Sequence, residues 1–496
     1  MSVIESSSGI GQAMGRQALP QLGANSARRN HSAFVAMTPF HRSVIGGLIL
    51  LYLVWIGFRH SFQPGLSSQS SWIFLALSLN FILLLLPLIF YRSTYGWFHP
   101  LIFNIFLTLV LHMRRSPIYL SGMLWHAGLP GWDPDALNRL VVEELLLRAL
   151  GLALLYAGYF LSVRLPIPHL RFHPPYHLRQ KIVVVVLFAL MIFLAYMQTR
   201  GGLISHILSW GRGRRTELAG DSYWGLFIQL GLTACLSWLA FDRNAHLRPL
   251  FWGCTGISFA IVFLMSGSRG DLVYFMVMGL MVWLLREQKI SFTKPALVIV
   301  MALLVLGLLG EFRTSTFRGD VDWGILTGRT ATEESALVTA IDEVSARSSE
   351  GNAVYPILAR VPAQVDFIRG RSYAAVLTLP IPRALWPEKP SMIGGQTGAI
   401  FFNSGAGIPP GPIGEPYWNF GIPGVAIVFL CFGIFYRWIT EVFQTYAHYP
   451  AAIILYVVTL LRCSEPSTPT IVAWLIVLVL AFLFLRLASL ISLGRS

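Results

Sequence analysis

The sequence predicts an all-α, polytopic integral membrane protein with about twelve transmembrane helices and one large outer loop. The 496-residue chain is 55% hydrophobic and only 12% charged, and its mean hydropathy is +0.63. A soluble protein carries about twice that share of charged residues. The apolar residues also form blocks long enough to cross a bilayer as helices, which satisfy all their backbone groups inside lipid. These blocks lie near 43–58, 72–90, 97–113, 140–162, 182–199, 224–241, 249–266, 271–285, 294–310, 421–436, 448–462 and 470–486.

The blocks divide the chain into four parts. Residues 1–42 are rich in Ser, Gly and Ala and lack an apolar core, so we expect a disordered cytoplasmic tail and no signal peptide. Residues 43–310 form an N-terminal bundle of about nine spans, 311–420 form the large periplasmic loop, and 421–496 form a C-terminal bundle of about three spans. Nothing in the chain has the spacing of cysteine metal ligands.

The distribution of Lys and Arg predicts the orientation of the spans. With the N-terminus in the cytoplasm, the inner segments carry seventeen cations and four acids, a net charge of +13, while most remaining acids fall outside. The inner cations are Arg16, Arg28, Arg29, Arg42, Arg92, Arg164, Arg171, Arg179, Lys181, Arg243, Arg248, Arg286, Lys289, Lys294, Arg437, Arg486 and Arg495.

One outer segment, 199–223, breaks this pattern because it contains "GRGRR", including Arg214 and Arg215. Clustered guanidinium groups suit an anionic ligand, since their paired N–H donors match phosphate oxygens. The alternative is a solvated loop that Glu217 and Asp221 partly neutralise.

The large loop has two halves of different character. An amphipathic helix is predicted at 330–349, where apolar residues recur at helical spacing. Further along, "LPIPRALWPEKPSMIGG" is too rich in Pro and Gly for helix, but the aromatic residues of the loop argue against disorder. They are Tyr373, Trp386, Tyr417, Trp418 and Phe420.

Three motifs resemble a known family. The large loop contains "GRSYAAVLTLPIPRALWPEKP" followed by "IGEPYWNFGIPG", and "SGSRG" lies upstream between two spans. On these motifs and on its topology, the chain resembles the Wzy-type oligosaccharide repeat-unit polymerases, the O-antigen and exopolysaccharide polymerases of bacterial inner membranes. The resemblance covers residues 40–490 by topology but only Gly267–Asp271 and Gly370–Gly424 by motif.

The resemblance implies a glycosyl transfer at the periplasmic face. A hydroxyl of one undecaprenyl-diphosphate-linked oligosaccharide attacks the reducing-end sugar of another, and undecaprenyl diphosphate leaves. The expected partners are these lipid-linked glycans, the bilayer, a chain-length regulator and a flippase; no nucleic acid and no cofactor are expected. An O-antigen ligase-type transferase and a lipid-linked oligosaccharide flippase are the alternatives.

The departing diphosphate needs cations, because negative charge develops on it in the transition state. Arg269 in "SGSRG" and Arg383 in "IPRALWP" are the catalytic candidates, and Arg313 would contact the diphosphate at headgroup depth. Arg214, Arg215 and Lys389 are further candidates for the anion. The structural alternatives are an Arg269–Asp271 pair that closes a turn and a salt bridge between Arg383 and Glu388.

The acceptor hydroxyl needs a general base. Glu415 in "IGEPYWNFG" is the candidate, beside aromatic residues that can stack on sugars, with Trp386 and Tyr417 expected to bind glycan. The alternative for Glu415 is an acid that the helix dipole favours near an N-terminus. Asp366 is the reserve base and His206 a possible substitute.

Two D-x-D pairs have a spacing that can hold a divalent cation. They are Asp133 with Asp135 and Asp320 with Asp322. Such pairs are frequent by chance, so no metal site is expected.

The sequence "GSRGD" predicts a helix break at the outer surface. Gly267 and Gly270 allow a tight turn, and Ser268 can bond the local backbone. Asp271 is expected to cap the next helix, which leaves Arg269 to face the donor diphosphate.

Overall fold

The structure is a computed structural model that describes residues 33–490, with gaps at 62–67, 121–131, 162, 164, 171–174, 210–221, 268, most of 289–351, 379–380, 382–384, 387 and 405–406. Every regular element among the described residues is helical, and the β contact between Ala36 and Gly96 is an isolated bridge. The helices are α1 Pro39–Ser61, α2 Ser68–Ile89, α3 Pro100–Leu120, α4 Pro134–Phe160, α5 Leu178–Thr199, α6 Leu203–Ser209, α8 Ser222–Phe241, η3 Ala245–Leu247, α9 Pro249–Ser266, α10 Arg269–Glu287, α13 Val354–Arg360, α14 Arg371–Leu377, α15 Ile393–Phe402, α16 Gly411–Tyr446, α17 Pro450–Arg462 and α18 Thr468–Leu490.

The predicted class, a helical membrane protein, agrees with the lengths and apolar character of these helices. Six of the described helices are long and apolar enough to cross a bilayer: α1, α2, α5, α8, α16 and α18. Eleven of the twelve predicted blocks fall on helices, while the block at 294–310 lies largely outside the described residues. The count of twelve spans stays a prediction.

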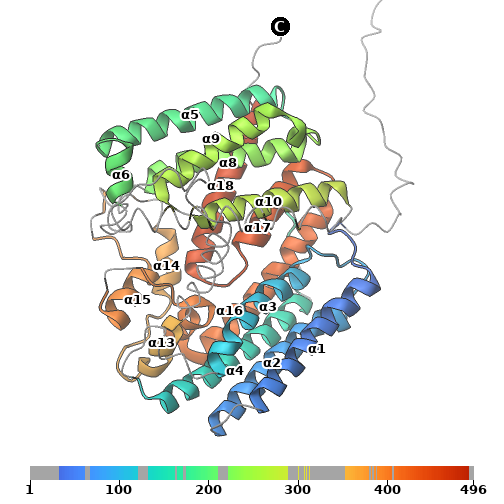
Figure 1. Cartoon of the computed structure of the whole chain (residues 1–496), viewed down its shortest axis with the longest axis vertical. Helices are drawn as coiled ribbons and strands as arrows, with labels where there is room; N and C mark the ends of the chain where they lie inside the picture. Colours follow the sequence, from blue (N-terminus) through green and yellow to red (C-terminus); the bar gives the residue numbers. More distant parts are fainter. Residues whose placement is uncertain are drawn as a thin grey trace, which may run out of the picture.

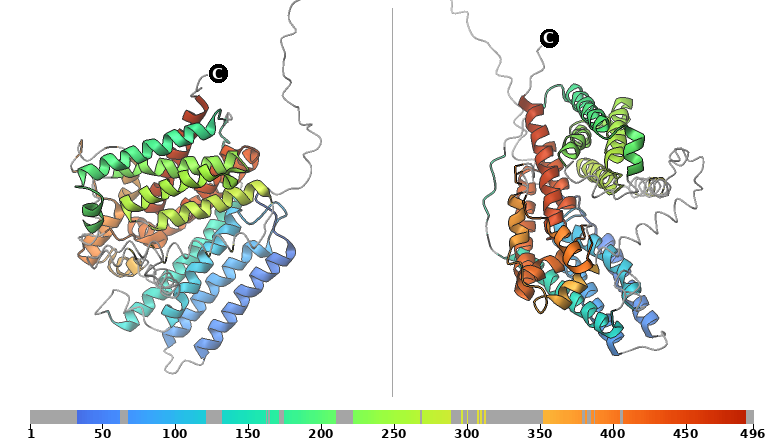
Figure 2. Two further views of the ribbon diagram at one scale, coloured as in Figure 1. Left: turned by 45° about the horizontal axis from the view of Figure 1, so that its top comes forward. Right: turned by 90° about the vertical axis from the view of Figure 1, so that its left-hand side faces the viewer.

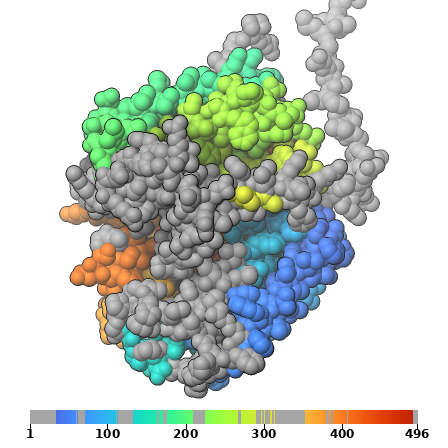
Figure 3. Space-filling model, viewed as in Figure 1, coloured from blue at the N-terminus to red at the C-terminus, as the bar shows by residue number. Residues whose placement is uncertain are grey.

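The helices form two groups that α16, α17 and α18 connect (Figure 1). One group packs α1–α4, α13 and α16 around a common apolar core. The other packs α5, α8, α9, α10, α17 and α18 around a second core. Figure 2 shows the same division from two further directions. In Figure 3, the green and yellow atoms of α5–α10 and the blue atoms of α1 and α2 occupy separate parts of one face.

The contact between α4 and α16 requires glycine. A Cβ atom on Gly433 would clash with the carbonyl oxygen of Leu155, and one on Gly158 would clash with the carbonyl oxygen of Leu430. Small residues let membrane helices approach until their backbones touch. The α4–α16 pair is therefore the most tightly approached contact of its group.

α16 changes direction at the predicted end of the large loop. Phe420 and Gly421 leave helical geometry, with φ/ψ of −145°/15° and 67°/−151°. The first quarter of α16, residues 411–419, lies within the predicted large loop, where little regular structure was expected. The helix begins there because Pro412 lies in the first turn, where proline loses no hydrogen bond.

The last residues of the predicted disordered tail pack into the structure instead. Phe34, Val35 and Met37 are buried, and the Tyr91 hydroxyl accepts a hydrogen bond from the Met37 amide at 3.3 Å. The aromatic and aliphatic side chains at 34–37 explain this difference, because they bury apolar surface that the Ser- and Gly-rich residues before them lack.

The break predicted at "GSRGD" is present. α9 ends at Ser266, and Gly267 adopts a left-handed conformation with φ 57° while its amide bonds the Phe263 carbonyl oxygen at 2.6 Å. α10 begins at Arg269. Asp271 lies in the first turn of α10, so it does not occupy the predicted cap position, although its charge still suits the helix dipole.

Candidate functional site

A short connector, residues 463–467 between α17 and α18, adjoins three polar clusters. Arg462 precedes it, Ser464 and Glu465 lie within it, and Thr468 follows it. Each of these positions contacts a different part of the chain.

The first cluster joins the connector to the "GSRGD" break. The Arg462 guanidinium donates a hydrogen bond to Asp271 Oδ1 at 3.0 Å and lies 4.2 Å from the ring centre of Tyr274. The arginine side chain is 12% exposed and the aspartate 26%. Asp271 thus pairs with Arg462, and the side chain of Arg269 lies outside the described residues.

The second cluster joins the connector to "IGEPYWNFG". Glu415 is completely buried. Its Oε2 accepts the Thr468 amide at 2.7 Å, and its Oε1 accepts the Thr468 hydroxyl. Asn419 bonds the Glu415 carbonyl oxygen at 2.8 Å and the Ser372 hydroxyl at 2.9 Å. These contacts tie α14, α16 and α18 together, and they favour the structural interpretation of Glu415 over that of a solvent-facing base.

The charge on Glu415 also affects its neighbour on α14. Burial raises the pKa of Tyr373, and the Glu415 carboxylate raises it further. The Tyr373 hydroxyl is buried and has no hydrogen-bond partner in the part of the chain that the structure describes. Tyr373 therefore stays neutral beside the carboxylate.

The third cluster lies between the connector and α4. Arg148 Nε donates to Glu144 Oε1 at 2.9 Å, and a second N–H of the same guanidinium contacts that oxygen. Glu144 is fully buried, and among the described residues neither its other oxygen nor the Asn104 amide nitrogen has a hydrogen-bond partner. Arg148 and Asn104 line a cavity of about 40 Å³ together with Ser464 and Glu465.

Sequence reasoning missed this third cluster. The signal was present, because Glu143, Glu144 and Arg148 are charged residues inside an apolar block, 140–162. Ionisable residues within a membrane span usually mark functional positions. The block was interpreted only by its length and hydropathy.

The predicted glycan-binding residues of the large loop lie at different depths. Trp386 is 38% exposed. Lys389 Nζ donates to the Ile381 carbonyl oxygen at 3.0 Å, and Tyr417 is half-buried. Four predicted cations fall outside the described residues: Arg214, Arg215, Arg313 and Arg383.

The remaining candidates for a base differ in accessibility. His206 is 3% exposed, and its Nε2 lies 2.8 Å from the Met265 carbonyl oxygen. Asp366 is exposed, and its carbonyl oxygen accepts the Trp418 indole N–H at 3.2 Å. Trp418 itself is fully buried, so it supports the loop and offers no stacking surface.

The structure describes only one of the two D-x-D pairs, Asp133 with Asp135. Asp133 caps α4, because its Oδ2 accepts the Ala136 amide at 3.0 Å. Asp320 and Asp322 lie outside the described residues. Within the described ranges, no group of three or more His, Cys, Asp or Glu side chains could hold a metal ion.

Comparison with known proteins finds no relative. No protein-family model matches the chain, and no curated protein or solved structure matches it significantly. The chemistry of the site must therefore be argued from its own residues.

Two arginines beside the connector are each paired with a carboxylate: Arg148 with Glu144 and Arg462 with Asp271. Arg148 and Arg462 are both largely buried, and buried cations interact with anions more strongly than solvated ones do. Each retains an acidic partner, so an incoming anion would compete with that carboxylate.

Proposed function

We propose that the chain is a polysaccharide polymerase of the Wzy type, which joins undecaprenyl-diphosphate-linked repeat units at the periplasmic face of a bacterial inner membrane. One observation supports this most. The two motif regions behind the resemblance, "GSRGD" (Gly267–Asp271) and "IGEPYWNFG", are far apart in sequence, yet both contact the ends of the connector, through Asp271–Arg462 and Glu415–Thr468.

In the proposed reaction, a hydroxyl oxygen of the acceptor glycan forms a bond to the anomeric carbon of the donor. The bond from that carbon to the diphosphate oxygen breaks, and undecaprenyl diphosphate leaves with the electron pair. Arg462, with Arg269 from the neighbouring helix break, neutralises the charge that develops on the leaving group. Arg383 and Arg313 are the further predicted cations.

The hydroxyl proton passes to a carboxylate. Glu415 has both oxygens bonded to Thr468, so we assign it a positioning role. Glu143 on α4 is half-buried and lies close enough to Tyr417 for its charge to act on that residue. We propose Glu143 as the base, with Tyr417 and Trp386 contacting the sugar rings.

Reconstitution of the purified protein tests the proposal. Lipid-linked repeat units presented on the outer face of proteoliposomes should give a ladder of polymers. Arg462→Gln should lose the ladder, whereas Arg486→Gln should keep it, because Arg486 lies on α18 at the predicted inner end. A protein that makes no ladder under any donor and acceptor pairing would refute the polymerase.

A transporter is the second candidate, because the buried Glu144–Arg148 pair lies inside an apolar helix. A flippase would move a fluorescent lipid-linked oligosaccharide across the bilayer and make no ladder. A ligase would instead attach the glycan to a lipid A core acceptor. The same proteoliposomes separate the three outcomes.

A further inference from the structure

A second polar region lies at the opposite end of α10 from Asp271. α10 has 19 residues, so its ends are about 28 Å apart at 1.5 Å per residue. Near Arg286, a cavity of about 690 Å³ opens between the start of α5 and the ends of α8 and α10. This volume is within the usual range for small-molecule sites, about 300–1,000 Å³.

The cavity is lined by three arginines and one acid: Arg179, Arg243, Arg286 and Asp242. Both carboxylate oxygens of Asp242 already accept hydrogen bonds from the protein. Asp242 accepts Arg179 at 3.2 Å and Arg248 at 3.1 Å, and its other oxygen accepts the Asn244 amide at 3.0 Å.

Arg243 and Arg286 are therefore the cations that Asp242 does not bind directly. Arg286 uses one N–H to donate to the Leu239 carbonyl oxygen at 3.1 Å. Burial lowers the pKa of Arg286, and the positive charge of Arg243 lowers it further. The carboxylates of Glu287 and Asp242 act on the pKa of Arg286 in the opposite direction, and an anion bound in the cavity would favour the charged guanidinium in the same way.

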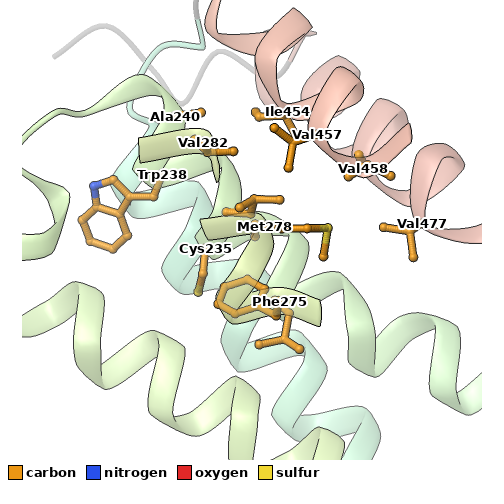
Figure 4. Close-up of a cluster of buried hydrophobic side chains, with 14 of the residues drawn as sticks. Cys235, Trp238, Ala240, Phe275, Met278, Val282, Ile454, Val457, Val458 and Val477 are labelled. Atoms are coloured by element: carbon orange, nitrogen blue, oxygen red, sulfur yellow. The ribbon is translucent and has the colours of Figure 1, made fainter. Parts of the chain in front are cut away.

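The inner wall of the cavity is apolar. Phe241, which is partly exposed, lines it, and behind it lies Trp238, whose fully buried indole projects away from the packed cluster of α8, α10 and α17 (Figure 4). The cavity thus combines guanidinium groups with the ring of Phe241. That combination fits a phosphate ester better than it fits a free inorganic ion, because guanidinium forks match phosphate oxygens and the ring contacts the attached carbon chain.

We propose that this cavity binds a phosphate ester, with Arg243 and Arg286 as its ligands. The positive-inside distribution predicts that this end faces the cytoplasm. An anionic lipid headgroup and a soluble phosphorylated metabolite share the required chemistry. The site lies a helix length from the connector, so it does not depend on the polymerase proposal.

The test uses the full-length protein in nanodiscs of phosphatidylcholine. Phosphatidylglycerol is added in one arm and glycerol 3-phosphate in the other, and binding is followed by thermal stability and by native mass spectrometry. The double variant Arg243→Gln/Arg286→Gln is compared with Arg486→Gln, which removes a charge outside the cavity at the same predicted face. Gel filtration of each variant in its nanodisc checks that it is folded.

We expect wild type and Arg486→Gln to bind one of the two ligands equally well, and the double variant to bind it at least about tenfold more weakly, since hydrogen bonds to charged groups are lost. Stabilisation by phosphatidylglycerol alone identifies a lipid site, and stabilisation by glycerol 3-phosphate identifies a soluble ligand. Equal binding by wild type and the folded double variant, or no binding of either ligand, would overturn the proposal.

Discussion

The two hydrogen bonds between Glu415 and Thr468 allow a structural role of Glu415 to be distinguished from a catalytic one. Glu415→Gln keeps the shape of the side chain and removes its charge. We expect this change to weaken the attachment of α16 to α18 and to leave the folded protein active. The reason is that the carboxylate is completely buried and both oxygens are engaged by Thr468.

The expected size follows from these two hydrogen bonds. A bond to a charged group contributes about 1.5–3 kcal/mol, and a bond between neutral groups about 0.5–1.5 kcal/mol. Glu415→Gln replaces two bonds to a charged group by two bonds between neutral groups. The change should therefore lower the unfolding free energy by about 2 kcal/mol. Thr468→Val removes the hydroxyl bond alone and should cost about 1.5–3 kcal/mol. The double variant should lose less than the sum of the two, because contacting residues share one interaction.

The assay measures unfolding in mixed micelles and polymer formed per amount of folded protein. A general base contributes about 10²–10⁴ in rate, whereas a positioning residue leaves the activity of the surviving protein close to wild type. Glu415→Gln with wild-type stability and a hundredfold loss of specific activity would refute our interpretation. Additive losses in the double variant would also contradict it.

Three other regions give further tests. Arg462→Gln should abolish polymer, while Asp271→Asn should keep the ladder and lower the unfolding free energy by about 1.5–3 kcal/mol, the contribution of a hydrogen bond to a charged group, because the ion pair is largely buried; ladders normalised to membrane-inserted protein decide this. Gly433→Ala should prevent stable folding because its Cβ has no room, and Gly253→Ala, where the space is open, should accumulate normally in immunoblots of membranes. Burial tends to raise the pKa of Asp242, but its amide and guanidinium donors outweigh burial and lower it. Its stabilising effect is therefore present above about pH 4, the ordinary aspartate pKa, and is lost as pH falls through the lowered value; Asp242→Asn should flatten this part of the pH–stability curve.

Local chemistry made several features predictable. Gly267 was expected to turn the chain because glycine accepts positive φ, and the structure has that turn. The apolar blocks predicted helices because their length and hydropathy leave few other solutions in lipid. The kink at Gly421 coincides with the predicted end of the large loop.

Pairings between distant elements were not predictable from one sequence. Arg462 and Asp271 are 191 residues apart, and Glu415 and Thr468 are 53 apart. Whether they meet depends on how α17 and α18 dock, which no local pattern specifies. The helix at 411–419 was not expected for a different reason: Pro412 lies in its first turn, where proline is compatible with a helix.

The glycine contact between α4 and α16 limits how these two helices can move. Because the backbones touch at Gly158 and Gly433 with no side chain between them, the two helices cannot slide past one another without losing contact along the joint. They should move as one rigid unit. Any opening that the proposed polymerisation requires must then come from elements outside this pair, and the break at Gly421 is where the short N-terminal part of α16 could change direction while the longer part stays fixed.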